Sequence, residues 1–467
     1  MILALAATLA IVVGDHTMLR AAPRANAGVL TSLAQGDTLE VRGERAGYLK
    51  VYDYRRERGG YLRSDTLREL DLTEASAPEL LAILRFLRDS PGSEALGISY
   101  GAAYLKAVPA RSLTAEPFDA IARMAERLAD AASSNGAHAA EVASHLEVVQ
   151  QFGIRMRTFE RNGQMQVCYD GELFHRVLVQ GGASAEQRAR AALGLTRPDC
   201  IDPDLSPAMR ASLDQERCAL LDAIDDSSLT AITKSRIRAR RAGVWASIAF
   251  EQARRAEQPS AAAARALAEL TSVHADDLGD DRRGEYIEAL LRVGAIRWAQ
   301  EPSAAQAGPF TLSVASGDPG QTCVSVHDAR RRPDVVLVRR CTYGIVWLAS
   351  AHAIAPASAL VLAVQPLDGW RELWVFHERS GAWAVDVLSP GTENPELGYV
   401  DFAGFAPNSR RLLIAREVQE HGRVQRRFEE LRLDDLALER QASRPDLLRD
   451  FGRWQDVTWR RDTLVLH

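Results

Sequence analysis

The sequence predicts a multidomain α+β protein: a small β-barrel, then an antiparallel helical domain, then an all-β domain that is either propeller-like or a sandwich. Three observations carry this prediction. Short apolar runs separated by turn residues fill residues 11–70, apolar residues recur at helical spacing over residues 72–301, and strand-like runs fill residues 310–467. The length of 467 residues suits about three domains of ordinary size.

The composition is that of a globular protein, with 46% apolar and 25% charged residues, so each domain can bury its own core. The formal net charge of −5 is too small to indicate a nucleic acid as a partner, and we expect none. One basic run, "KSRIRARR" over residues 234–241, suits either a phosphate-binding strip or the solvated face of a helix. We favour the solvated face.

The chain begins with the apolar run "MILALAATLAIVV", in which only Thr8 is polar. This run is shorter than the roughly 20 residues that span a bilayer, and it matches the apolar region of a secretory signal. The first basic residue is Arg20, so the basic start of such a signal is missing. We expect residues 1–10 to be a signal remnant and Ile11 to open the first strand. A buried first strand is the alternative. The expected localisation is periplasmic or otherwise exported, with no integral membrane segment.

The five cysteines form no CxxC pair and are widely spaced, so we expect no metal site and no cofactor. An exported chain is expected to oxidise some of its cysteines. Cys323 and Cys341 lie in neighbouring strand-like runs, where antiparallel pairing would bring them within disulfide reach. Cys168 and Cys200 each lie beside turn residues and form the second expected pair. Cys218 lies in a helical pattern and is expected to be buried and free.

Residues 11–70 read as about five short strands, among them "DTLEVRG", "YLKVYDY" and "GGYLRS". Side chains alternate along a strand, so Leu39 and Val41 should face the core with Leu49 or Val51. Glycine tolerates backbone angles closed to other residues. Tight turns are therefore expected at Gly36-Asp37 and before the last strands, at Gly47 and Gly60.

Four segments of this region, "TMLRAAP", "QGDTLEV", "GYLKV" and "GYLRSDTL", resemble the bacterial SH3-type domains of exported proteins. The positions that match the family's pattern are Arg20, Pro23, Gly36, Asp37, Gly47, Val51 and Gly60. Met18 stands where the family has Asn, and Tyr48 and Tyr61 stand where it has Trp. The resemblance covers about 55 residues and implies a small barrel that serves as a binding module.

Residues 72–301 carry the helical pattern, and a short strand pair is expected to interrupt it at Met165–Val179. A linker follows, and then the strand-rich residues 310–467. Within these, residues 360–388 and residues 412–441 look alike, and each reads strand, turn, strand, turn, strand. A blade of a propeller takes about 40 to 50 residues, so this region is long enough for three or four. We therefore expect a partial propeller or a sandwich.

One motif suggests catalysis. "GISYG", at residues 97–101, fits the Gly-x-Ser-x-Gly elbow that presents the nucleophile of a serine hydrolase, here Ser99. That elbow follows a strand, whereas the residues before Ser99 do not read as one. Small residues that let a helix approach its neighbour explain the motif as well. The sequence holds no phosphate-binding loop, no HExxH and no dinucleotide fingerprint, so we expect no catalytic residue.

Tyr48, Tyr52, Tyr54 and Tyr61 are the candidate ligand-binding residues, because tyrosine offers flat area with a polar tip. Strand alternation is expected to bury two of the four. The sequence thus predicts a non-enzymatic exported envelope protein that binds or scaffolds a cell-wall peptide, a glycan or another envelope protein. The alternatives are a serine hydrolase acting through Ser99 and a regulatory partner of an envelope enzyme.

Overall fold

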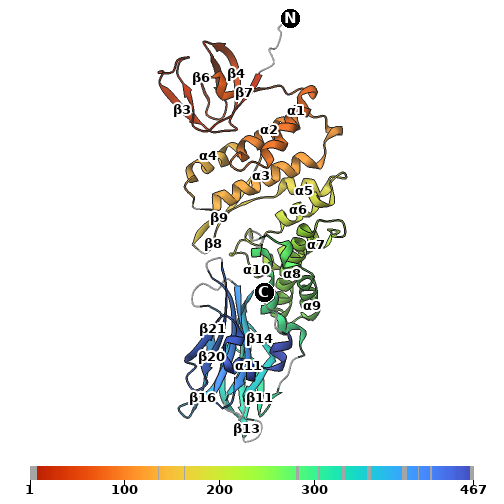
Figure 1. Ribbon diagram of the computed structural model, residues 1–467, viewed down its shortest axis with the longest axis vertical. Coiled ribbons are helices and arrows are strands. Elements are labelled where there is room, and N and C mark those ends of the chain that lie inside the picture. The colour runs from red at the N-terminus through yellow and green to blue at the C-terminus, as the bar shows by residue number, and fades with distance from the viewer. Residues whose placement is uncertain are drawn as a thin grey trace. The chain divides into compact units, whose positions relative to one another are not determined.

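The computed structural model divides by its contacts into two compact units, Met1–Leu205 and Ser206–His467 (Figure 1). It describes residues 8–134, 136–161, 163–279, 283–302, 306–328, 332–354, 359–391, 397–408, 410–420 and 423–462. The protein is a mixed α+β chain, with an antiparallel sheet at its start, helices in its middle and stranded layers at its end.

The first unit opens with one seven-stranded sheet in the order β3-β2-β6-β5-β4-β1-β7. The strands are β1 Thr8–Val12, β2 Thr17–Arg20, β3 Val29–Leu33, β4 Thr38–Arg45, β5 Tyr48–Asp53, β6 Arg58–Arg63 and β7 Leu67–Leu70. Its neighbouring strands pair antiparallel. The antiparallel sheet of the expected small barrel is present, but it does not close, because the end strands β3 and β7 do not pair with each other. Instead, Ile11 on β1 packs against apolar residues of α1 and α2.

The start of this sheet differs from the expectation for residues 1–10. Thr8 to Ala10 pair with β4, and Ala10 is fully buried in the core of the sheet. The other residues of the expected signal remnant, 1–7, lie outside the described residues. Burial of Ala10 and Val12 gives the sheet its apolar face.

The interior of the sheet is built largely as expected. Leu39, Leu49 and Val51 are buried together, and Val41 packs against them. Gly36 and Gly47 have left-handed backbone angles, φ 87° and 73°, in turns that other residues adopt less easily. Gly60 corrects the expectation, because it lies within β6 rather than in a turn. A Cβ at Gly60 would lie 2.7 Å from Leu19 Cγ, so this glycine lets β2 approach.

Six helices and a hairpin complete the first unit. The helices are α1 Ala77–Arg88, α2 Glu94–Ala107, α3 Ala115–Ser133, α4 Ala139–Gln150, α5 Glu172–Val179 and α6 Ala185–Leu195, and the hairpin joins β8 Met156–Arg161 to β9 Gln164–Tyr169. α3 contributes the largest share of the apolar core that these helices and the hairpin enclose.

The strand pair expected over Met165–Val179 is half right. Its first part is β9, but "ELFHRVLV" forms α5. Gly171 begins that helix with a left-handed φ of 86°, and the Asp170 carboxylate accepts a hydrogen bond from the Glu172 N–H. Phe174 and Val177, three residues apart, then bury one face of the helix.

The second unit begins with four helices, α7 Pro207–Asp222, α8 Ala231–Arg254, α9 Ser260–Thr271 and α10 Arg283–Ala295. The basic run of α8 is not the solvated face that we expected. Arg240 and Arg241 are buried, and Arg236 and Arg240 both form ion pairs with Glu285. Arg241 donates to the carbonyl oxygens of Leu221 and Ile224. These arginines therefore join α8 to its neighbours.

Three successive antiparallel meanders of four strands follow. The first comprises β10 Gln306–Ala307, β11 Phe310–Ser316, β12 Thr322–Asp328 and β13 Arg332–Thr342. The second comprises β14 Ile345–Ile354, β15 Ala359–Leu367, β16 Trp370–Arg379 and β17 Ala382–Leu388. The third comprises β18 Leu397–Ala406, β19 Arg411–Glu420, β20 Arg423–Arg432 and β21 Leu438–Ala442. The two look-alike segments are the last three strands of the second and third meanders, as expected.

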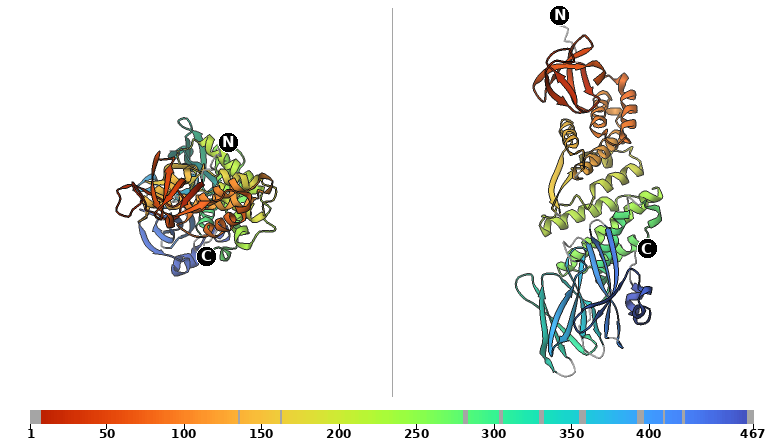
Figure 2. Two further views of the ribbon diagram at one scale, coloured as in Figure 1. Left: turned by 90° about the horizontal axis from the view of Figure 1, so that it is seen from above. Right: turned by 60° about the vertical axis from the view of Figure 1, so that its left-hand side comes forward.

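The first meander is a sheet of its own, whereas a parallel pairing of β16 with β18 joins the second and third meanders into one eight-stranded sheet. One apolar cluster joins the first to the second, and another joins the second to the third. Leu360 and Val361 point to opposite clusters, because neighbouring side chains of a strand face opposite ways. Two short helices, α11 Arg449–Trp454 and α12 Val457–Asp462, cover the outer face of the third meander. The right-hand view of Figure 2 shows these helices beside the last strands.

A buried arginine ties the helices of the second unit to its strands. Arg371 on β16 is fully buried and donates to the carbonyl oxygens of Gly294 and Ala295 at the end of α10. It also pairs with Asp401 on β18. Burial lowers the pKa of Arg371 to about 10, against the attraction of Asp401, so the guanidinium still carries its charge at neutral pH.

Candidate functional site

The candidate tyrosines lie on the outward face of the first sheet. Tyr48 and Tyr52 occupy alternate positions of β5, and Leu49 and Val51 between them face the core. The register places Tyr61 of β6 opposite Lys50, hence on the same outward face. None of the four tyrosines is buried, and Tyr54 is 65% exposed. The expectation that two would be core is therefore wrong.

Two of the tyrosines are held in a fixed arrangement. The rings of Tyr52 and Tyr54 meet edge to face with centroids 5.0 Å apart, and the Arg42 guanidinium lies 4.0 Å from the Tyr52 centroid. Arg42 Nε is 2.6 Å from Glu40 Oε2, and the Tyr54 hydroxyl donates to the same oxygen at 3.1 Å. The hydrogen bond from Arg42 lowers the pKa of Glu40. These contacts hold the Tyr52 and Tyr54 rings against each other.

Basic residues surround this surface, which we call the tyrosine face: the outward side of β5 and β6 together with Arg42 and Tyr54. Tyr48 lies opposite Arg63, and Tyr61 lies between Lys50 and Arg20 in neighbouring strands. Flat rings with hydroxyl tips suit sugar rings and peptide planes, and the cations suit a carboxylate. The arrangement can therefore hold a polar, anionic ligand by stacking and hydrogen bonding.

Ser99 does not occupy a nucleophile elbow. It lies in the middle of α2 and is 2% exposed, and its hydroxyl donates to the carbonyl oxygens of Gly36 at 2.8 Å and Ala95 at 2.9 Å. The flanking glycines face α3. A Cβ at Gly97 would collide with Met124, and a Cβ at Gly101 would lie 2.6 Å from Ile121 Cγ1. The motif serves close helix packing in this structure.

A polar cluster that the sequence did not predict lies between the sheet and α4. His145 Nε2 is 2.9 Å from Asp15 Oδ1, and His145 is 3% exposed. The Gln35 backbone N–H and side-chain amide each donate to the Asp15 carboxylate at 3.0 Å. Burial by itself would raise the pKa of Asp15, but the Gln35 N–H and His145 outweigh it and lower the pKa.

The structure contains the two disulfides expected from the sequence, Cys168–Cys200 and Cys323–Cys341, and Cys218 is buried and free. Burial and the neighbouring Asp222 raise the pKa of the Cys218 thiol to about 12, so it stays protonated at neutral pH.

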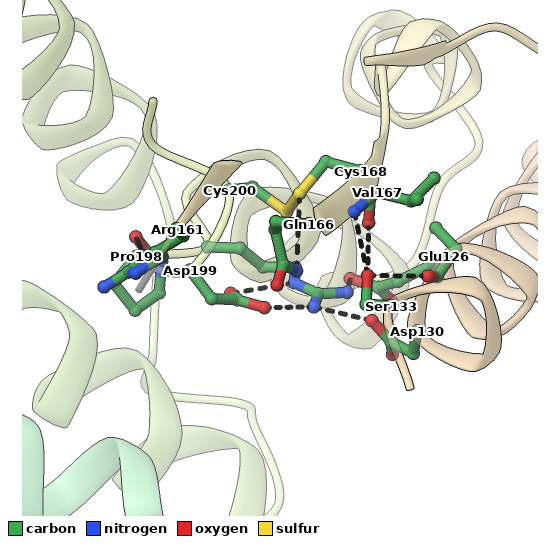
Figure 3. Close-up of a disulfide and its surroundings, with 12 residues drawn as sticks. Glu126, Asp130, Ser133, Arg161, Gln166, Val167, Cys168, Pro198, Asp199 and Cys200 are labelled. Carbon is green, nitrogen blue, oxygen red and sulfur yellow. Dashed lines mark hydrogen bonds and ion pairs between the residues drawn. A yellow bond between two sulfur atoms is a disulfide. The ribbon is translucent and has the colours of Figure 1, made fainter. Parts of the chain in front are cut away.

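Figure 3 shows how the first disulfide is embedded. Cys168 lies on β9, whose Val167 exchanges two hydrogen bonds with the Ser133 hydroxyl at the end of α3. On the other side, Arg161 of β8 donates to the Pro198 carbonyl oxygen at 2.9 Å. The adjacent Arg197 forms ion pairs with Glu126, Asp130 and Asp199. The disulfide therefore fastens the chain after α6 to the hairpin and α3.

Comparison with known protein families, with curated proteins and with solved structures finds no match to this chain. Within the described residues, no helix is both long enough and apolar enough to cross a membrane.

Proposed function

We propose that the protein is an exported, non-enzymatic binding protein of the cell envelope, and that its first sheet is an SH3-type module whose ligand lies on the tyrosine face. The observation that carries the proposal is the gathering of four unburied tyrosines and several cations on one side of a small sheet. The ligand class that this chemistry favours is a cell-wall peptide, whose free carboxylates would meet the cations.

The two disulfides support export, because they suit an oxidising compartment better than the reducing cytosol. Disulfides of this kind would also protect the chain outside the cell.

The second unit would serve as the scaffold. Each of its three meanders has four antiparallel strands and shares an apolar cluster with the next, as propeller blades do, although β16 and β18 also join the second and third meanders into one eight-stranded sheet. We infer a partial, propeller-like stack that holds a partner protein, while the first sheet holds the wall peptide.

Titration of the full chain with soluble muropeptides tests the tyrosine face. Tyr52→Ala and Tyr54→Ala should each weaken binding by about tenfold, because stacking and cation–π contacts contribute roughly 1 kcal/mol or more each. The measurement is isothermal calorimetry at low salt. Tyr343→Ala is the matched control, since Tyr343 is 67% exposed and lies in the second unit.

The proposal fails if the wild-type chain shows no heat with millimolar muropeptide. It also fails if the control variant loses as much affinity as the Tyr52 and Tyr54 variants. In the second case the ligand binds outside the tyrosine face.

A further inference from the structure

Three side chains that coordinate metals in many proteins converge in the first unit. One ligand atom from each of Asp15, Glu141 and His145 lies within 4.8 Å of the others. Asp15 lies in the turn between β1 and β2, and Glu141 and His145 lie one turn apart on α4. Residues at this spacing share a helix face, so both side chains reach toward Asp15.

Hydrogen bonds fix the orientation of the Asp15 carboxylate, as they do for carboxylate ligands in metal sites. Gln35 donates to both of its oxygens, through the backbone N–H and through Nε2. The same Nε2 donates to the Gly92 carbonyl oxygen at 2.6 Å, so both amide hydrogens are used. The 3.3 Å contact between Gln35 Nε2 and His145 Nε2 is therefore not a hydrogen bond, and His145 Nε2–H donates to Asp15. Such outer partners fix ligand geometry in metal sites.

We propose that Asp15, Glu141 and His145 bind a divalent first-row transition metal ion of the zinc class. A set of imidazole nitrogen and carboxylate oxygen suits such an ion better than calcium or magnesium, which prefer oxygen alone. Solvent supplies the fourth ligand, because Glu141 is partly exposed.

Binding exchanges one hydrogen bond for two coordinate bonds. In the metal-bound form the His145 ring carries its proton on Nδ1, which leaves the Nε2 lone pair for the metal. The Asp15 oxygen that accepted the hydrogen bond from Nε2 then binds the same ion. The ion would link the β1–β2 turn to a helix 130 residues further along the chain.

The test uses the untagged full chain, freed of metal by a chelator and titrated with Zn²⁺ alone in a calorimeter. We expect one equivalent to bind, and Co²⁺ to give the visible absorption of a four-coordinate site. Glu141→Gln and His145→Gln should each lower the affinity by more than about tenfold. His175→Ala is the matched control, because His175 is an exposed histidine of the same unit on α5.

Melting curves recorded in the presence of a chelator separate a loss of metal binding from a loss of folding. Glu141 is partly exposed, so Glu141→Gln should melt like the wild type without metal and lose only the rise in melting temperature that Zn²⁺ brings. Absence of Zn²⁺ binding at micromolar concentration overturns the proposal. Unchanged affinity in Glu141→Gln and His145→Gln also overturns it, and leaves the cluster a hydrogen-bonded junction.

Discussion

Glycines decide how closely the helices of the first unit approach. Gly97 and Gly101 lie one turn apart on α2, and both face side chains of α3. Between them Ser99 points to the other side, where it bonds to the Gly36 carbonyl oxygen of the sheet. A pattern that resembles a catalytic elbow is thus explained by contacts on two faces of one helix.

Gly101→Ala should destabilise the protein by about 1–2 kcal/mol. The new methyl group would lie 2.6 Å from Ile121 Cγ1, a β-branched side chain that can yield little, and this strain exceeds the helix propensity gained. Gly243→Ala on α8 is the control, because its Cβ would meet Ala289 at an ordinary 3.8 Å. That substitution should be neutral or stabilising by about 0.5–1 kcal/mol. Urea unfolding measures both, and equal effects would contradict the packing argument.

The candidate site could be predicted only in part at the scale of residues. The tyrosines stood out by type, but strand alternation was expected to bury two of the four, and the structure leaves all four unburied. Tyr61 required the strand register. The cluster of Asp15 and His145 could not be predicted, because it depends on how the sheet meets α4, and no periodicity connects residues so far apart.

At the scale of elements, helices and strands were predicted correctly where the local sequence pattern fitted only one of the two. Apolar spacing predicted long helices such as α3 and α8. The expected antiparallel pairing of β12 with β13 placed Cys323 opposite Cys341, as the structure has them. The segment that became α5 was ambiguous, because a short apolar run fits a strand or a helix. The left-handed Gly171 decided the outcome. Closure of the first sheet is a contact between elements, which local patterns do not encode.

Mass mapping of unreduced peptides should find Cys168 linked to Cys200, Cys323 linked to Cys341, and one free thiol. Replacing Cys168 and Cys200 together by alanine should cost about 3 kcal/mol, because a cross-link spanning 32 residues restricts the unfolded chain. Cys218→Ala is the control and should keep both links. Five free thiols in freshly isolated protein would contradict the disulfides and weaken the case for export.

At the scale of the whole molecule, the helical pattern of residues 72–301 belongs to two units rather than one. Contacts assign α7 to α10 to the same unit as the meanders. Arg292 on α10 pairs with Asp368 at 2.5 Å, and Gly294 lies directly against the Tyr399 ring. Uniform helical spacing gave no sign of this division, because both halves satisfy the same period.

The folding of separate fragments of the chain tests the division into two units. Residues 206–467 should fold alone and unfold cooperatively, and so should residues 1–205. Residues 310–467, cut at the change in sequence pattern, should not, because Arg371 would lose the carbonyl oxygens that it binds and stay buried without them. Circular dichroism melts and amide NMR dispersion report the result. A cooperative transition in residues 310–467 would show that the meanders are independent of the helices.

The contact between Arg371 and α10 also affects the order in which the second unit can fold during synthesis. Gly294 and Ala295, whose carbonyl oxygens accept hydrogen bonds from Arg371, are synthesised 77 and 76 residues before that arginine. At roughly 5–20 residues per second, the wait lasts about 4–15 s. During that interval the end of α10 lacks the guanidinium that binds it, so the junction between the helices and strands of the second unit forms late in synthesis. Under the export that we propose, such a delay would keep this half of the chain open while it passes through an export channel.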